Sequence, residues 1–314
     1  MFETLLSTAF IVGLLQATIR NATPLLLAGI GEMVGERSGV LNIGLEGIML
    51  IGCLFGFLAA NLTGVVWYGI IAGGLAGVAI SLIHAFLSIN LGVNQVVSGV
   101  GINILCSGLS LTIYRAVYGM SSSNIPRAPS QQGLFIPGLS ELPVVGPLLF
   151  RQLPLVYIAF ALVPVAWFLL YRTEFGLKIR AVGEHPMAAE TLGINVVLIR
   201  YVCVMVTGLL TGLAGTFLSL GLLNIFRDNM TAGRGWIAIA VVIFGRWKPK
   251  GVLFASLIFG LANAFQLRLQ AVGVDIPYQF LLMLPYVLTM IILMVTYGRS
   301  ESPAALGKPY VKEG

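Results

Sequence analysis

Polar side chains that interrupt long apolar stretches are the residues of this sequence that could do chemistry. The amide and carboxyl members of this set are Asn42, Glu46, Asn94, Gln95, Asn103 and Asn263. Polar groups are costly in hydrocarbon, so such residues usually face the interior of a helix bundle or a water-filled path. Asn and Gln supply hydrogen-bond donors and acceptors together, which suits a path for neutral, hydroxyl-rich solutes. The alternative is that these residues only join helices to one another.

The spacing of Asn42 and Glu46 predicts that they share one face of a helix, because residues four apart are neighbours on a helix. Asn carries no charge, but an ionised Glu46 would need a partner. The neighbouring sequence offers none, so we expect Glu46 either to be protonated or to lie at the cytoplasmic mouth of the path.

Catalytic and metal-binding motifs are missing from the sequence. It contains no phosphate-binding loop, no His-Glu-x-x-His and no Gly-x-Ser-x-Gly. His84 and His185 are far apart in sequence, and the three cysteines have no metal-ligand spacing. We therefore expect no catalytic residue, metal or cofactor in this chain.

The elements that must position these residues are membrane helices. The sequence is 58% hydrophobic and 10% charged, whereas soluble domains carry about a quarter charged residues. A spanning helix needs about 20 apolar residues. The sequence thus predicts an all-α polytopic transmembrane bundle of about ten segments. Their expected ranges are Phe2–Ile19, Thr23–Val34, Gly44–Ala60, Val65–Ile89, Asn94–Val117, Gln152–Tyr171, Val196–Leu223, Thr231–Phe244, Gly251–Leu269 and Ile276–Tyr297.

Two of these segments, Thr23–Val34 and Thr231–Phe244, are too short to span a membrane comfortably. Each is followed by a charged turn and a glycine. A pair of short, interrupted segments in corresponding halves indicates a transport path, because unwound backbone is tolerated only against protein or water. Two ordinary kinked helices fit this pattern equally well. Glycines spaced four apart, as at Gly73 and Gly77 and at Gly208 and Gly212, predict close helix packing.

The lysines and arginines indicate the orientation. With the N-terminus inside, the larger share of the 18 basic residues falls in cytoplasmic loops, which predicts that both termini are inside. Residues 172–195 then form a cytoplasmic loop, residues 118–150 an extracytoplasmic loop and residues 299–314 a cytoplasmic tail. The net charge of +6 is scattered and not gathered on one face, so no nucleic-acid partner is expected.

A polar stretch in the cytoplasmic loop predicts a short helix over Met187–Leu192. Pro186 suits its first turn, Glu184 lies near its positive end, and Gly193 can adopt the left-handed conformation that ends a helix. So short a helix is marginal alone and needs a partner. Its small residues would allow it to enter a groove in another protein; the alternative is an ordinary loop helix.

This loop resembles the coupling loop of ABC importer permeases, which docks on the ATPase subunit. Two further stretches look like signatures of the permease group for nucleosides and simple sugars, a group related to the ribose and branched-chain amino acid permeases. They are "GERSGVLNIGLEGIMLIG" at Gly35–Gly52 and "NMTAGRGWIAIAVVIFGRWKPKG" at Asn229–Gly251. The resemblance extends from about Thr23 to Tyr297, and "SGVLNIGLEG" and "MTAGRG" favour the nucleoside branch.

The resemblance implies that residues 1–314 form one permease domain in a bacterial cytoplasmic membrane. Two permease chains, identical or different, would meet two ATPase subunits inside and a substrate-binding protein or lipoprotein outside. ATP hydrolysis would occur on the separate ATPase, so this chain is not expected to be an enzyme. A simple-sugar permease and an ion-coupled secondary transporter remain alternatives, with Glu46 as the candidate relay of the latter. The implied coupling residues are Arg180, Gly183, Glu184, Pro186, Ala188, Ala189, Leu192 and Gly193.

Overall fold

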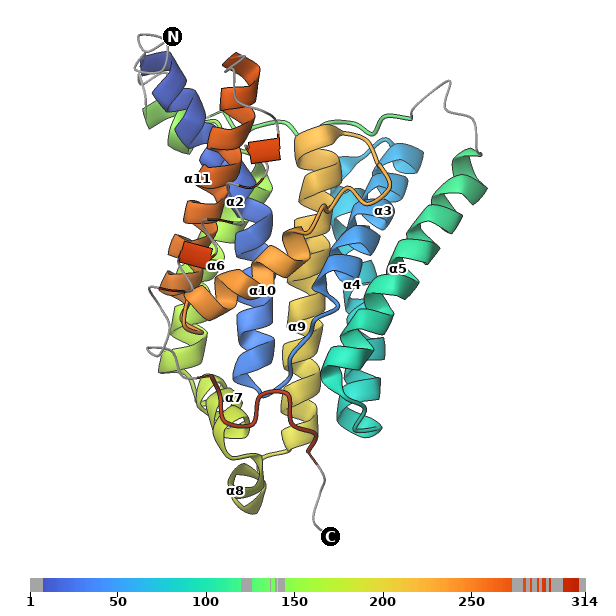
Figure 1. Ribbon diagram of the computed structural model, residues 1–314, viewed down its shortest axis with the longest axis vertical. Helices are drawn as coiled ribbons and strands as arrows, with labels where there is room; N and C mark the ends of the chain where they lie inside the picture. Colours follow the sequence, from blue (N-terminus) through green and yellow to red (C-terminus); the bar gives the residue numbers. More distant parts are fainter. Residues whose placement is uncertain are drawn as a thin grey trace.

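The computed structural model describes residues 8–119, 126–135, 145–272 and 302–310, with a few isolated positions within 137–140 and 279–294. All regular structure in these residues is helical, as predicted, and seven of the described helices are long and apolar enough to cross a membrane (Figure 1). The long elements are α2 (Thr8–Arg37), α3 (Leu45–Thr63), α4 (Val66–Ala85), α5 (Gln95–Tyr118), α6 (Pro154–Arg172), α9 (Val196–Thr216) and α11 (Pro249–Val272). The short elements are α7 (Glu174–Glu184), α8 (Pro186–Thr191), α10 (Arg234–Phe244) and the π-helical turns η1 (Phe86–Asn90), η2 (Gly146–Phe150) and η3 (Phe217–Leu223).

The first two predicted segments are one continuous helix. α2 runs through Pro24, so the prediction of a separate short segment at Thr23–Val34 is wrong. Proline removes one backbone donor, but a membrane helix tolerates it where side chains and neighbouring helices take up the polar groups nearby. The Thr23 hydroxyl donates to the Ile19 carbonyl at 2.8 Å, and Arg20 Nε donates to Gln152 Oε1 at 3.3 Å.

The second short segment is confirmed as the separate helix α10, of 11 residues. At 1.5 Å per residue it is about 16 Å long, roughly half the thickness of the hydrocarbon core. It begins after Gly233, whose φ of +83° lies in the left-handed region that favours glycine. In Figure 1 α10 lies obliquely at mid-height, and it packs against α2, α11 and α3.

Two other predictions meet the structure only in part. Most of the last expected span, Ile276–Tyr297, and part of the loop 118–150 lie outside the described residues. The loop 172–195 contains the expected short helix, as α8, and in addition α7, which the sequence analysis did not predict. α7 is amphipathic and buries Ile179 and Val182 against the bundle, which holds this loop against the membrane helices.

Backbone-to-backbone contact joins α3, α4 and α9. A Cβ atom placed on Gly212 of α9 would lie 2.3 Å from the Gly73 carbonyl oxygen of α4. One on Gly52 of α3 would lie 2.4 Å from the Gly212 oxygen, and one on Gly77 would lie 2.2 Å from the Gly208 oxygen. The glycine spacing therefore does mark close helix packing, and we call this contact the glycine seam.

We expect Gly212→Ala to lower the thermal unfolding midpoint of the detergent-solubilised protein, because the added methyl group would force α4 and α9 apart. Gly108→Ala in α5 is the matched control, since nothing lies within 4 Å of a Cβ built there. Alanine raises helix propensity at both positions by about 1 kcal/mol. Equal midpoints for the two variants would contradict the seam.

Candidate functional site

Residues 38–44 connect α2 to α3 as irregular backbone inside the bundle. Ser38, Val40, Asn42 and Gly44 are buried. In Figure 1 the connection rises from the lower end of α2 to the start of α3. Buried N–H and C=O groups without partners cost free energy, so this segment needs partners from its surroundings. We call it the extended segment.

Two side chains accept hydrogen bonds from the N–H groups of the extended segment. The Asn42 N–H donates to Glu32 Oε1 at 2.7 Å, and the Leu41 N–H donates to Gln95 Oε1 at 2.7 Å. Glu32 comes from α2 and is fully buried, and the exposed fraction of Gln95 is 2%. The predicted path residue Gln95 therefore contacts the backbone that carries Asn42.

The carbonyl groups of the extended segment are bound from α4 and α5. The His84 Nε2 atom lies 3.0 Å from the Leu41 oxygen, and Asn103 Nδ2 donates to the Ile43 oxygen at 3.0 Å. Asn103 Oδ1 in turn accepts from the Gly47 N–H at 2.8 Å, in the first turn of α3. One amide thus fixes both the end of the extended segment and the start of the helix.

Glu46 joins two helix starts. It lies in the first turn of α3, and its carboxylate accepts from the Gly233 N–H at 2.8 Å and from the Gly235 N–H at 2.6 Å. These donors belong to the N-terminus of α10, where free N–H groups and the helix dipole favour an anion. The partner that the neighbouring sequence lacked comes from the other half of the chain.

Asn42 does not share a helix face with Glu46, because it precedes the helix. Its Oδ1 accepts from the Gly44 N–H at 2.9 Å, a local turn contact that leads the chain into α3. The expected face is wrong for this reason. The two residues still lie in the same region, since the extended segment runs directly into the first turn of α3.

The remaining predicted path residues have different surroundings. Asn94 is exposed and caps α5, with Oδ1 accepting from the N–H groups of Val96 at 2.9 Å and Val97 at 3.3 Å. Asn263 lies on α11, which packs against α2, α6 and α10, and its Oδ1 makes no hydrogen bond within the described residues. The structure therefore brings together Asn42, Glu46, Gln95 and Asn103, and it leaves Asn94, at the exposed start of α5, and Asn263 apart from them.

Sequence reasoning missed two ionisable residues that hold this site, Glu32 in α2 and Arg200 in α9. Both are buried, at 0% and 1% exposure. The signal was present, since each is an ionisable residue within an apolar stretch, where such residues usually have a partner or a function. His84 is also buried and hydrogen-bonded.

The extended segment begins, at Ser38, near the end of the bundle that carries α7 and α8, which we call the base of the bundle. There α8 follows α7 and is the lowest helix in Figure 1. Pro186 begins α8, and Gly193 after it has a φ of +78°, as the sequence predicts. Among the coupling residues implied by the resemblance, Gly183 and Ala189 are buried, Arg180 and Pro186 are half-buried, and Glu184, Ala188, Leu192 and Gly193 are exposed.

Residues 302–310, which we call the tail segment, fold back across this base. The Ala305 N–H donates to the Gly183 carbonyl at 2.9 Å, and the Gly307 N–H donates to the Gly39 carbonyl at 3.2 Å. Arg200 completes the contact, because its Nε donates to the Ser38 carbonyl at 3.3 Å and its Nη1 to the Lys308 carbonyl at 3.3 Å. The tail segment thereby ties α7 to the start of the extended segment.

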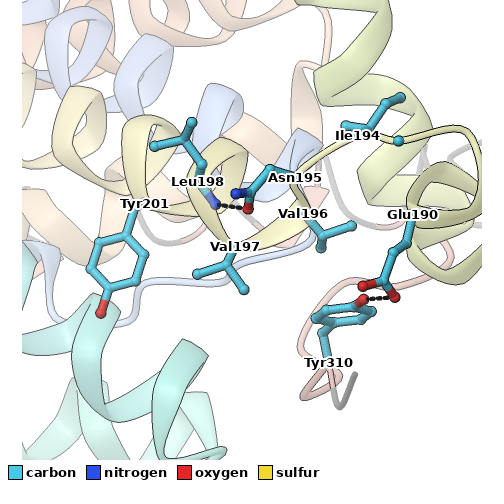
Figure 2. A pocket seen from close by; sticks show the side chains of 9 residues that line it. Glu190, Ile194, Asn195, Val196, Val197, Leu198, Tyr201 and Tyr310 are labelled. Carbon is cyan, nitrogen blue, oxygen red and sulfur yellow. Dashed lines mark hydrogen bonds between the residues drawn. The ribbon is translucent and has the colours of Figure 1, made fainter. Parts of the chain in front are cut away.

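A groove of about 630 Å³ lies beside α8 (Figure 2). It is formed by the end of α8, the start of α9 and the tail segment, and Tyr310 donates a hydrogen bond to Glu190 across it. Exposed Val197 and Leu198 give one side of the groove an apolar surface. The base of the bundle therefore offers an exposed short helix next to a groove, which together could receive a part of another protein.

We expect Glu46→Gln to lower the thermal unfolding midpoint of the solubilised protein. Both carboxylate oxygens accept N–H groups of α10, whereas an amide has one acceptor and would turn its NH₂ toward a donor. Hydrogen bonds to a charged group contribute about 1.5–3 kcal/mol each. Glu174→Gln, at an exposed position in the first turn of α7, is the matched control. Equal midpoints would show that the contact with α10 does not stabilise the fold.

Comparison with known proteins gives relatives along nearly the whole chain. It is 42% identical to the guanosine ABC transporter permease protein NupQ of Bacillus subtilis, covering 94% of this chain and 95% of the relative. It is 41% identical to the putative glucose ABC transporter permease protein TsgC13 of Haloferax volcanii, covering 97% and 99%. It is 37% identical to the nucleoside ABC transporter permease protein NupC of Lactococcus lactis, covering 96% and 99%.

No solved structure matches the chain. The family model for the permease component of branched-chain amino acid transport systems matches residues 14–295, a range that contains the extended segment, Glu46, α10 and the loop with α7 and α8. This protein therefore belongs to that family of membrane permease components of ABC transporters.

Proposed function

We propose that this protein is the permease subunit of an ATP-driven importer of nucleosides in a bacterial cytoplasmic membrane, with both termini inside. The observation that carries the substrate class is the pair of relatives named for guanosine and for nucleosides, each aligned over nearly its full length. A relative named for glucose is almost as similar, so a simple-sugar importer is the second candidate.

The junction of the extended segment, α3 and α10 supports a path at this place. Discontinuous helices that meet inside a bundle are typical of transport sites. Asn42 Nδ2 and Gln95 Nε2 are buried and make no hydrogen bond within the described residues. Buried donors without a partner call for an explanation. Water or a solute hydroxyl passing along the path would provide their acceptor, as the amide-rich lining predicts.

The proposed lining of the path contains all six residues that the sequence predicts, although the structure supports some of them more directly than others. It consists of Asn42, Glu46, Asn94, Gln95, Asn103 and Asn263. In the present conformation Gln95 and Asn103 bond to the extended segment, so a shift of that segment would release their amides toward a solute. Glu46 would report the same shift, because it joins the start of α3 to α10.

The contacts at the base suggest how ATP hydrolysis on separate ATPase subunits would move this path. A partner that displaces α8 would pull on α7 and on the tail segment, which bonds to Gly183. The tail segment and Arg200 would pass the movement to Ser38 and Gly39, where the extended segment begins. The energy would enter through a protein contact, and no catalytic residue is required in this chain. A second permease chain and an extracytoplasmic binding protein would complete the importer.

An ion-coupled secondary transporter is the rival mechanism, and it would need an ionisable relay inside the membrane. Both oxygens of Glu46 accept backbone N–H groups, so protonating it would cost one of these hydrogen bonds, which makes Glu46 a better structural anchor than relay. Glu32 accepts the Asn42 N–H through Oε1 alone, and its Oε2 makes no hydrogen bond within the described residues. The contacts of Glu46 favour the ATP-driven mechanism.

The substrate class is tested by uptake into proteoliposomes that contain the permease, its ATPase subunits and its binding protein. We expect ATP-dependent uptake of guanosine, competed by other nucleosides and unaffected by excess glucose. Uptake of glucose with no uptake of guanosine would favour the sugar importer. Uptake that continues without ATP and stops with an uncoupler would overturn the ABC mechanism.

The docking role of α8 is tested by Ala188→Arg. Ala188 is exposed, and an arginine there would have to be desolvated in a packed cleft, which is costly. We expect loss of ATPase co-purification and of uptake, with normal membrane insertion. Ser130→Arg, exposed in the loop between α5 and α6, is the control and should retain both. Undiminished ATPase retention in the Ala188 variant would refute docking at α8.

A further inference from the structure

A second cavity, of about 260 Å³, lies between the end of α6 and the start of α11. It is lined by Trp167, Tyr171, Lys248, Pro249 and Lys250. Both lysines are exposed, and none of the described residues that line the cavity is acidic. The path and the coupling groove do not use this cavity, which has none of their residues.

Two arginines add positive charge beside the cavity. The guanidinium group of Arg172 lies 5.6 Å from the centre of the Trp167 ring, and that of Arg180 lies 5.2 Å from the centre of the Tyr171 ring. Arg180 Nε is buried and makes no hydrogen bond within the described residues. The wall of the cavity is mostly apolar, and its two lysines together with the two neighbouring arginines place four basic side chains at or beside it. Lysine and arginine side chains are the usual donors to a phosphate oxygen.

An exposed apolar surface continues from this cavity. Lys250 begins a stripe on α11 at helical spacing that includes Phe254, Ile258 and Leu261, which are 64%, 42% and 42% exposed. Phe168 on α6, next to Trp167, is 56% exposed. Contiguous exposed apolar residues of this kind fit hydrocarbon and not water. Trp and Tyr at the end of a span mark the level of the lipid headgroups.

We propose that this cavity binds the headgroup of an anionic phospholipid, with the acyl chains of the lipid along the stripe on α11. The phosphate would accept hydrogen bonds from the lysine and arginine donors, and the net positive charge would favour a headgroup without a cationic group of its own. Basic pockets between membrane helices recognise anionic headgroups in this way. A free phosphate ion shares the headgroup chemistry but would make no use of the apolar stripe.

The test uses the full chain purified in nanodiscs that contain equal amounts of phosphatidylglycerol and phosphatidylcholine, with retained lipid counted by native mass spectrometry. The variant is Lys248→Gln with Lys250→Gln. The matched control is Lys178→Gln with Lys308→Gln, which removes the same charge from exposed positions outside the cavity. A third variant, Lys248→Arg with Lys250→Arg, keeps the charge and should keep the lipid.

We expect the wild type and the control to retain phosphatidylglycerol in preference to phosphatidylcholine. The cavity variant should lower this preference by about tenfold, since each basic residue near an anionic headgroup contributes several-fold in affinity. Equal retention in the cavity variant and the control would overturn the proposal. Displacement of phosphatidylglycerol by millimolar inorganic phosphate would overturn the lipid as the occupant. These measurements do not depend on transport, so they stand apart from the test of the nucleoside importer.

Discussion

A length of backbone without helical hydrogen bonds, buried inside a membrane bundle, must obtain a partner for its polar groups from side chains. The extended segment is such a length of backbone, and polar side chains of the bundle form hydrogen bonds with its N–H and C=O groups. Glu32, His84, Gln95 and Asn103 come from three different helices, yet each bonds to residues 41–43. The arrangement of α2, α4 and α5 around α3 is therefore tied to the same few peptide groups.

This demand links the two roles that the sequence left open for its polar residues. An amide that holds the extended segment joins helices, and in the proposed mechanism it would also face the path when that segment moves. Lining and structural support would then be two states of the same side chain. Glu46 extends this relation to the second half of the chain. It lies in the first turn of α3, and its carboxylate accepts N–H groups at the start of α10.

The membrane helices could be predicted because apolar length alone determines them. The predicted ranges for α3, for α5 and for α9 together with η3 agree with the structure to within a few residues. The break near Pro24 was predicted wrongly, because a proline within a membrane helix need not end it. The partners of Glu46, Gly233 and Gly235, were out of reach because they lie in the other half of the chain. Local pattern shows where a polar group sits, but not which distant backbone meets it.

The glycine seam has a consequence for movement. Where backbone touches backbone, no side chain lies between the helices to change rotamer and absorb a displacement, so α3, α4 and α9 must travel as one rigid body. Side chains fill the boundary of α10 with α2, where a Cβ atom on Gly29 would meet the Val241 side chain at 3.2 Å, so a displacement can be absorbed there. The extended segment leads from α2 into the rigid body at α3. It occupies the position of a hinge, and its irregular backbone has the freedom in φ and ψ that a hinge needs.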